Sequence, residues 1–124
     1  MKKRVEKYIP DALCALQEAQ IVVDGKYDNE YAGYISAFGP SVIQTGLIPT
    51  IAFYSRKGGD ADRGKVGKAI LKIIAPEERQ QVLLNYVLDH NTEEMKNKIL
   101  DAIVALKLAI RTFEKIGKEE RGES

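Results

Sequence analysis

The segment from Ser41 to Lys57 constrains the fold of this chain more than any other part of its sequence. Its apolar residues recur at helical spacing, a single glycine, Gly46, interrupts them, and the adjacent cations Arg56 and Lys57 close it. Apolar residues three and four positions apart form one face of an amphipathic helix, and glycine commonly ends a helix. The segment therefore predicts two short helices that pack through a tight joint and display charge at the far end.

Residues Ile48 to Ser55 allow a second interpretation, because they are rich in β-branched and aromatic side chains. Such residues are enriched in strands, and the spacing of a short apolar run does not separate the two structures cleanly. A strand here would also supply the first element of a nucleotide-binding fold. We favour the helix, in which Pro49 lies in the first turn, where a missing N–H costs nothing.

Glycine and proline divide the rest of the chain into further helical segments. Pro10 either kinks the first helix or marks its start, Gly25 caps its end, and Gly39-Pro40 separates the next two helices. The expected helices span about residues 3–23, 29–38, 40–46, 47–57, 65–74, 76–89 and 91–117. We therefore predict an all-α fold, a bundle of about six or seven helices with a long C-terminal helix.

The length of the chain, 124 residues, is typical of one domain. At this size, folding buries about two thirds of the surface that the unfolded chain exposes, so a core can form without disulfides or metal ions. We predict a single helical domain over residues 1–124, with a polar tail that frays after about residue 117.

The composition excludes several classes of protein. A hydrophobic content of 44% and a charged content of 30% are typical of a globular protein rather than a disordered one. No run approaches the roughly 20 apolar residues of a membrane helix, and no signal-peptide core follows the basic N-terminus. Cys14 is the only cysteine, so no internal disulfide can form, which fits a reducing compartment. We expect a cytoplasmic protein without membrane contact.

The residues from Gly59 to Val66 nearly match a P-loop, but Val66 stands where that motif needs a hydroxyl to hold Mg²⁺. Residues 58–62 also resemble the metal-binding turn of nucleotide cyclases, yet no pair of strands flanks them. His90 is the only histidine, and with Cys14 it cannot supply a His-pair metal site. We therefore expect no enzyme activity, no small-molecule substrate, and no metal or cofactor.

The basic residues form three groups, although the formal net charge is only +1. The groups are Lys2, Lys3, Arg4 and Lys7; Arg56, Lys57, Arg63, Lys65, Lys68 and Lys72; and Lys107, Arg111, Lys115 and Lys118. The middle group surrounds a glycine-rich turn, expected to be flexible, with only Asp60 and Asp62 against it, so it is the best candidate for binding phosphates. No aromatic residue is interleaved with its cations, so the sequence does not predict base stacking.

A motif in the segment described first connects the chain to a known family. The motif consists of Pro40, Val42-Ile43, Gly46-Leu47, Ala52-Phe53 and Lys57. A basic first helix, a tyrosine-bearing second helix and a long closing helix follow the order of elements in that family. In these features the chain resembles the small all-helical subunit of the type III-B (Cmr) CRISPR effector complex.

This resemblance implies a non-catalytic subunit of an RNA-guided, RNA-targeting complex. Copies of such a subunit would stack into a short filament beside the guide-bearing subunits and help to hold the target RNA. The partners would be other Cmr subunits, further copies of the chain, the guide RNA complex and the single-stranded target RNA. Recognition would be of the RNA backbone, because pairing with the guide already reads the sequence.

We assign two functional surfaces on this basis. The residues expected to contact target phosphates are Arg56, Lys57, Lys65 and Lys68. At the subunit interface, Lys107 and Arg111 are expected to meet acidic residues of a neighbouring copy. The acidic candidates are Glu77, Glu78, Glu93 and Glu94.

Two other functions remain open from the sequence. The chain could be a stand-alone helical adaptor or regulator that binds a protein through an apolar groove. It could also be a small DNA-binding helical protein, in which Lys68 and Lys72 come nearest to a recognition helix. Against the latter, no helix-turn-helix with a polar recognition helix is evident.

Overall fold

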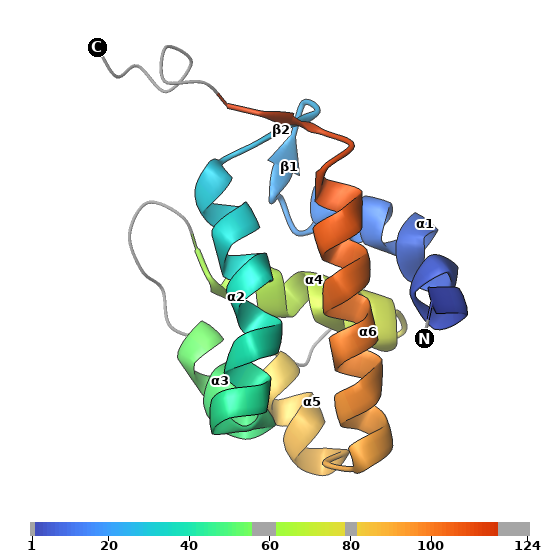
Figure 1. Cartoon of the computed structure of the whole chain (residues 1–124), viewed down its shortest axis with the longest axis vertical. Helices are drawn as coiled ribbons and strands as arrows, with labels where there is room; N and C mark the ends of the chain where they lie inside the picture. The colour runs from blue at the N-terminus through green and yellow to red at the C-terminus, as the bar shows by residue number, and fades with distance from the viewer. Residues whose placement is uncertain (1, 56–61, 79–81, 117–124) are drawn as a thin grey trace.

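Six helices account for most of the residues that the computed structural model describes, which are 2–55, 62–78 and 82–116 (Figure 1). The helices are α1 (Lys2–Glu18), α2 (Asn29–Thr45), α3 (Leu47–Tyr54), α4 (Gly64–Ile74), α5 (Leu83–Asp89) and α6 (Glu93–Ile110). The last is the longest, with 18 residues. The predicted all-α fold with a long C-terminal helix is therefore confirmed.

Helix α6 runs through the fold and packs against α1, α2 and α4 (Figure 1). The Thr92 side chain accepts a hydrogen bond from the Met95 N–H at 3.0 Å, so Thr92 is the cap. Nine residues of α6 are buried, including the small residues Ala102, Ala105 and Ala109. Alanine lets neighbouring backbones approach closely, and this allows several helices to pack around α6.

Helix α1 continues through Pro10, so the helix does not begin at the proline. Pro10 is exposed, and so is Glu6, whose carbonyl loses its helical partner to the proline. Water can satisfy that carbonyl, which explains why the helix tolerates the residue.

Helix α2 likewise continues through Gly39 and Pro40, so the prediction of two separate helices there is wrong. Pro40 is exposed, and so is Ser36, whose carbonyl loses its helical hydrogen bond to the proline. Water can satisfy this carbonyl, as it can that of Glu6 in α1. The predicted joint at Gly46 is present, because Gly46 has φ +103° and lies between α2 and α3. The predicted helix after the joint is confirmed as α3, and the strand alternative for this segment is wrong.

The boundaries of α5 and α6 also differ from those expected. Helix α5 begins at Leu83 rather than Pro76, and residues 76 and 77 form a turn. Val82, the residue before α5, has an extended backbone with ψ 156°. Helix α6 ends at Ile110 rather than near Gly117, because the chain turns there to join a small sheet.

Three strands of two residues each form this sheet, which the sequence did not predict. The strands β1 (Val22–Val23) and β2 (Lys26–Tyr27) form an antiparallel hairpin, and β3 (Glu114–Lys115) pairs parallel with β2. Asp24 and Gly25 connect the hairpin with φ values of +55° and +76°. Positive φ at both central residues is what a tight two-residue hairpin needs, so Gly25 turns a hairpin and does not cap a helix.

The core draws buried residues from all six helices and excludes almost all polar side chains. Asp101 on α6 is an exception, with 4% of its surface exposed. Its carboxylate accepts a hydrogen bond from the Arg4 guanidinium at 2.9 Å, and this ion pair joins the start of α1 to α6. A buried carboxylate needs such a partner, since its desolvation is costly.

Some expectations fall outside the described residues. Arg56, Lys57 and the glycine-rich turn at 58–60 belong to 56–61, and the tail expected to fray belongs to 117–124. Among the helices that the structure describes, none combines the length and the apolar composition needed to cross a membrane.

The substitution Arg4→Met tests the ion pair with Asp101. It keeps much of the aliphatic length but leaves the buried carboxylate without its cation, so we expect the free energy of unfolding to fall by about 1–2 kcal/mol. Urea unfolding measures this change. Lys7→Met, at an exposed position of the same helix, is the matched control. If the free energy of unfolding falls equally in the two variants, water solvates the Asp101 carboxylate as well as Arg4 does.

Candidate nucleic-acid interface

The candidate interface lies where α3 ends and α4 begins, on either side of residues 56–61. Asp62 fixes the start of α4 in two ways. Its side chain accepts a hydrogen bond from the Gly64 N–H at 2.8 Å, and its own N–H donates to the Tyr31 hydroxyl at 3.1 Å. The first turn of α4, which carries the cations, is thereby held against α2.

Helix α4 brings Lys65 and Lys68 to one hollow of about 380 Å³. Ala19, Gln20, Ser55, Asp62 and Gly64 complete its lining. The Lys65 ammonium donates to the Gln20 carbonyl oxygen at 3.3 Å, and Lys68 is exposed. The structure thus brings together two of the four predicted phosphate-binding residues. Arg56 and Lys57 lie outside the described residues.

The cations of α4 differ in how far their charge is already compensated. Lys72 forms an ion pair with Glu18 at 3.5 Å. Lys65 and Lys68 have no ion pair with any described residue. Of the three lysines of α4, Lys65 and Lys68 are therefore the two whose charge remains available to bind an anion.

The Arg63 guanidinium lies over two aromatic rings, so aromatic side chains accompany these cations in space although none is interleaved with them in the sequence. Its guanidinium carbon is 4.7 Å from the centre of the Tyr34 ring and 4.8 Å from that of Phe53. Both distances are within the range of cation–π attraction. The sequence could not reveal this arrangement, because Tyr34, Phe53 and Arg63 belong to three different elements that only the packing brings together.

The two rings belong to a larger aromatic cluster at the α2–α3 contact. Tyr54 is its centre, in edge contact with Tyr34, Phe38 and Phe53 at centroid distances of 6.5, 4.9 and 5.9 Å. The Tyr54 hydroxyl also donates a hydrogen bond to the Tyr34 carbonyl oxygen. Burial raises the pKa of Tyr54 above its ordinary value of 10.0, and the positive charge of Arg63 opposes this shift.

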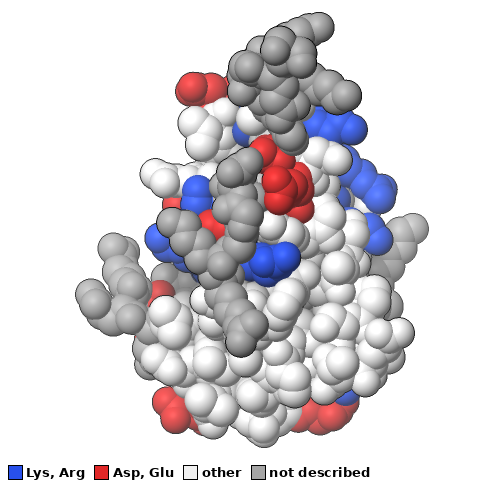
Figure 2. All heavy atoms as spheres, turned by 90° about the vertical axis from the view of Figure 1, so that its left-hand side faces the viewer, with Lys and Arg blue, Asp and Glu red and all other residues white. Residues whose placement is uncertain are grey.

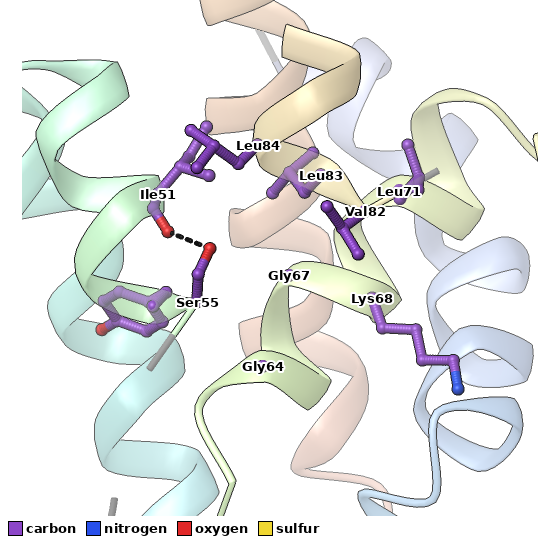
Figure 3. A pocket seen from close by; sticks show the side chains of 10 residues that line it. Ile51, Ser55, Gly64, Gly67, Lys68, Leu71, Val82, Leu83 and Leu84 are labelled. Atoms are coloured by element: carbon purple, nitrogen blue, oxygen red, sulfur yellow. Dashed lines mark hydrogen bonds between the residues drawn. The ribbon is translucent and has the colours of Figure 1, made fainter. Parts of the chain in front are cut away.

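A second cavity, of about 550 Å³, opens between α3, α4 and α5 (Figure 3). Its wall is mostly apolar and includes Ile51, Leu71 and Leu83, while the ammonium of Lys68 points away from these side chains (Figure 3). The Ser55 hydroxyl donates to the Ile51 carbonyl oxygen at 2.9 Å, so its proton is already engaged. This cavity therefore offers an apolar surface rather than a set of catalytic groups.

The structure of the same region contradicts the P-loop interpretation. The segment before the glycine-rich turn is helix α3, whereas a P-loop follows a strand. Val66, at the position of the metal-binding hydroxyl, is fully buried in the core. The first turn of α4 therefore lacks both the strand and the hydroxyl on which the P-loop depends.

Lys107 and Arg111, the predicted interface residues, lie at the C-terminal end of α6 beside the small sheet (Figure 1). Both are exposed, and neither has an ion pair among the described residues. The expected stripe stops there, because Lys115 lies on β3 and Lys118 is outside the described residues. The acidic candidates Glu93 and Glu94 begin α6, so the two charge types are at opposite ends of one helix.

The surface of α3 and the C-terminal half of α2 is almost free of charge. Figure 2 shows this area as the broad uncharged lower part of one face, below the basic side chains. No charged residue occurs between Glu30 and Arg56, a sequence signal that marks this surface directly. Ile43 is 69% exposed and Phe53 is 50% exposed on these helices. Exposed apolar side chains that gather on an uncharged surface commonly mark an interface.

The variant Tyr54→Phe tests the aromatic cluster through its pH dependence. At neutral pH the loss of one hydrogen bond should lower the free energy of unfolding by about 1 kcal/mol. The folded-state pKa of Tyr54 lies above the unfolded value, so the hydroxyl stabilises the fold fully below pH 10.0 and loses this effect as pH rises through the folded-state pKa. The difference in free energy of unfolding between wild type and variant should therefore shrink as the pH rises above 10.0.

Urea unfolding at a series of alkaline pH values measures this difference. Tyr86→Phe is the control, since the Tyr86 hydroxyl has no hydrogen bond to a described residue. A Tyr54→Phe difference that stays constant across this pH range would contradict the assigned role of the hydroxyl.

Comparisons with known proteins agree with the resemblance seen in the sequence. The family model described as CRISPR-associated protein (Cas_Cmr5) matches residues 7–111. A comparison with curated proteins gave no match, and neither did a comparison with solved structures. The matched range begins within α1, ends just after α6 and includes the whole of the other five described helices. The chain therefore belongs to the Cas_Cmr5 family of CRISPR-associated proteins, the small helical Cmr subunits that its sequence resembles.

Proposed function

We propose that this chain is a non-catalytic subunit of a type III-B CRISPR effector complex that holds single-stranded target RNA by its backbone. Family membership supports a place among the Cmr subunits. The observation that carries the RNA-binding role is the pair Lys65 and Lys68, which line one hollow and have no described ion pair. Arg56 and Lys57, the other two residues that we propose to contact phosphate, lie outside the described residues.

The chemistry of the hollow suits phosphate better than any other part of an RNA. Lysine side chains bind phosphate as point charges, and the release of condensed counterions drives the association. Asp62 also lines the hollow, and its side chain accepts a hydrogen bond from the Gly64 N–H, so the described lining carries two cations against one carboxylate. Since guide pairing reads the sequence in such complexes, the protein needs to recognise only the backbone.

We further propose that copies of the chain stack head to tail in the cytoplasm, each acting as one domain over residues 1–124. A contact between different surfaces of identical copies gives an open filament when the rotation between copies does not close a ring. Lys107 and Arg111 lie at one end of α6, and Glu93 and Glu94 lie at the other. This polarity suits a contact in which the basic end of one copy meets the acidic end of the next.

The uncharged surface around Ile43 supports a second candidate, an adaptor that binds protein alone. Ile43 is 69% exposed and Phe53 is 50% exposed on a surface without charged side chains, and an apolar patch of this kind is what a protein partner would cover. Binding to single-stranded RNA separates the two candidates, because an adaptor of this kind needs no affinity for RNA.

Reversal of charge at both lysines, Lys65→Glu with Lys68→Glu, tests RNA binding by the chain. Affinity should fall by the same factor for RNAs of unrelated sequence. Each phosphate contact in a single strand contributes about 0.7 to the slope of log affinity against log salt, so the slope should become less steep by about 1.4. Fluorescence anisotropy at several salt concentrations measures both quantities.

The control for this experiment is Lys96→Glu with Lys98→Glu, which makes the same change in net charge near the start of α6. It should leave the salt slope unchanged. An unchanged slope in the Lys65 and Lys68 variant would remove these residues from the RNA surface.

Reversal at the other predicted surface, Lys107→Glu with Arg111→Glu, tests head-to-tail stacking. Like charges would then face each other, so fewer copies should join a reconstituted complex, as counted by native mass spectrometry. Copies with Glu93→Lys and Glu94→Lys should restore assembly when mixed with this variant. Lys7→Glu with Lys98→Glu is the charge-matched control. Normal assembly of the Lys107 and Arg111 variant would show that water alone contacts this end of α6.

A further inference from the structure

We propose that Phe53 and Arg63 form a stacking site for one base of a single-stranded RNA. The site would add a contact to the base itself, beyond the backbone contacts of Lys65 and Lys68, and it rests on the proposed RNA-binding function. The observation behind it is the Arg63 guanidinium, which lies over the rings of both Phe53 and Tyr34.

Phe53 is suited to stacking because much of its ring remains outside the core. Half of its surface is exposed, whereas Tyr54, the next residue of α3, is only 5% exposed. Within the protein, Phe53 makes an edge contact with Tyr54 and borders the Arg63 guanidinium. An exposed aromatic ring beside a planar cation is the arrangement on which unpaired bases stack in many single-strand-binding proteins.

The Arg63 side chain supplies charge as well as a flat surface. A guanidinium has five N–H donors, and none of those of Arg63 bonds to a described residue. These donors remain available for the phosphate or the edge of the stacked nucleotide. Arg63 precedes Lys65 by two positions, so base contact and phosphate contact would come from the same turn of the chain.

The surrounding hydrogen bonds hold this site in place before any RNA binds. The Tyr34 hydroxyl donates to Glu30 at 3.1 Å, and the Tyr54 hydroxyl donates to the Tyr34 carbonyl oxygen. Tyr31 accepts the N–H of Asp62, the residue before Arg63. Because the rings and the backbone are already positioned, little conformational entropy is lost on binding. Stacking of this kind tolerates any base, since every base has a π-face.

The decisive comparison is between an RNA oligonucleotide and an abasic oligonucleotide of the same length, which keeps the sugar-phosphate chain but offers no base. Phe53→Leu keeps an apolar side chain and removes the ring. We expect it to weaken binding to RNA by about fivefold or more and to leave binding to the abasic strand unchanged. Arg63→Lys, which keeps the charge but loses the plane, should show the same selectivity.

Two further variants give the comparison its controls. Ile43→Ala removes another exposed apolar side chain from the same uncharged surface and should change neither affinity. Lys65→Glu should weaken binding to both strands alike, because both carry phosphates. If neither strand binds the wild-type chain, the proposed function fails and the stacking site fails with it. If Lys65→Glu acts as expected but Phe53→Leu affects both strands equally or neither, the stacking site alone is overturned.

A fluorescent reporter tests the contact directly, because the chain contains no tryptophan. Phe53→Trp keeps an aromatic ring at the site, and a base stacked on the indole should quench its emission when RNA is added. Leu88→Trp places the reporter at an exposed position of α5 and should not be quenched. Equal quenching of both reporters would overturn the proposal. So would a Phe53→Leu chain that binds RNA normally but fails to join the complex, since Phe53 would then contact protein.

Discussion

The burial of α6 on several sides is the constraint on which the rest of the structure depends. This helix touches α1, α2 and α4, and its small buried residues, such as Ala102 and Ala105, allow that close approach. The ion pair between Arg4 and Asp101 adds a polar connection where an unpaired carboxylate would be costly. Because α2 and α4 both pack on α6, their separation is set, and with it the position of the first turn of α4 relative to α2.

This packing explains how a chain with little net charge can carry a local concentration of positive charge, the surface that we propose binds RNA. Charge is absent from residues 31–55 and concentrated at the start of α4, where Asp62 and Tyr31 hold the backbone. Lys65 and Lys68 form no ion pair with a described residue, whereas Lys72 is paired with Glu18. The protein therefore separates two kinds of surface, one that suits phosphates and one that suits apolar neighbours. For the RNA and protein contacts that we propose, this separation means that the two contacts do not compete.

Most helices were predictable because their apolar residues follow the helical period, and the cap at Thr92 and the joint at Gly46 were predictable from local chemistry. The errors have physical reasons. Pro10 and Pro40 were expected to interrupt helices, but exposed carbonyls near them can bond to water instead. Asp24-Gly25 resembled a helix end, because both a cap and a hairpin turn use positive φ. The pairing of β3 with β2 joins positions far apart in the chain, and no local pattern encodes it.

The candidate functional residues divide in the same way. Local spacing was enough to select Lys65 and Lys68 and the basic end of α6 at Lys107, because charges on one helix keep their relation wherever the helix packs. Spacing gave no hint of the ring pair around Arg63, because Tyr34 and Phe53 reach it only through the packing of α2 on α3. Periodicity and capping act within a few residues, so the sequence specifies helices, joints and charged faces. Which side chains meet across helices depends on how the apolar faces fit together, and that is a property of the folded chain as a whole.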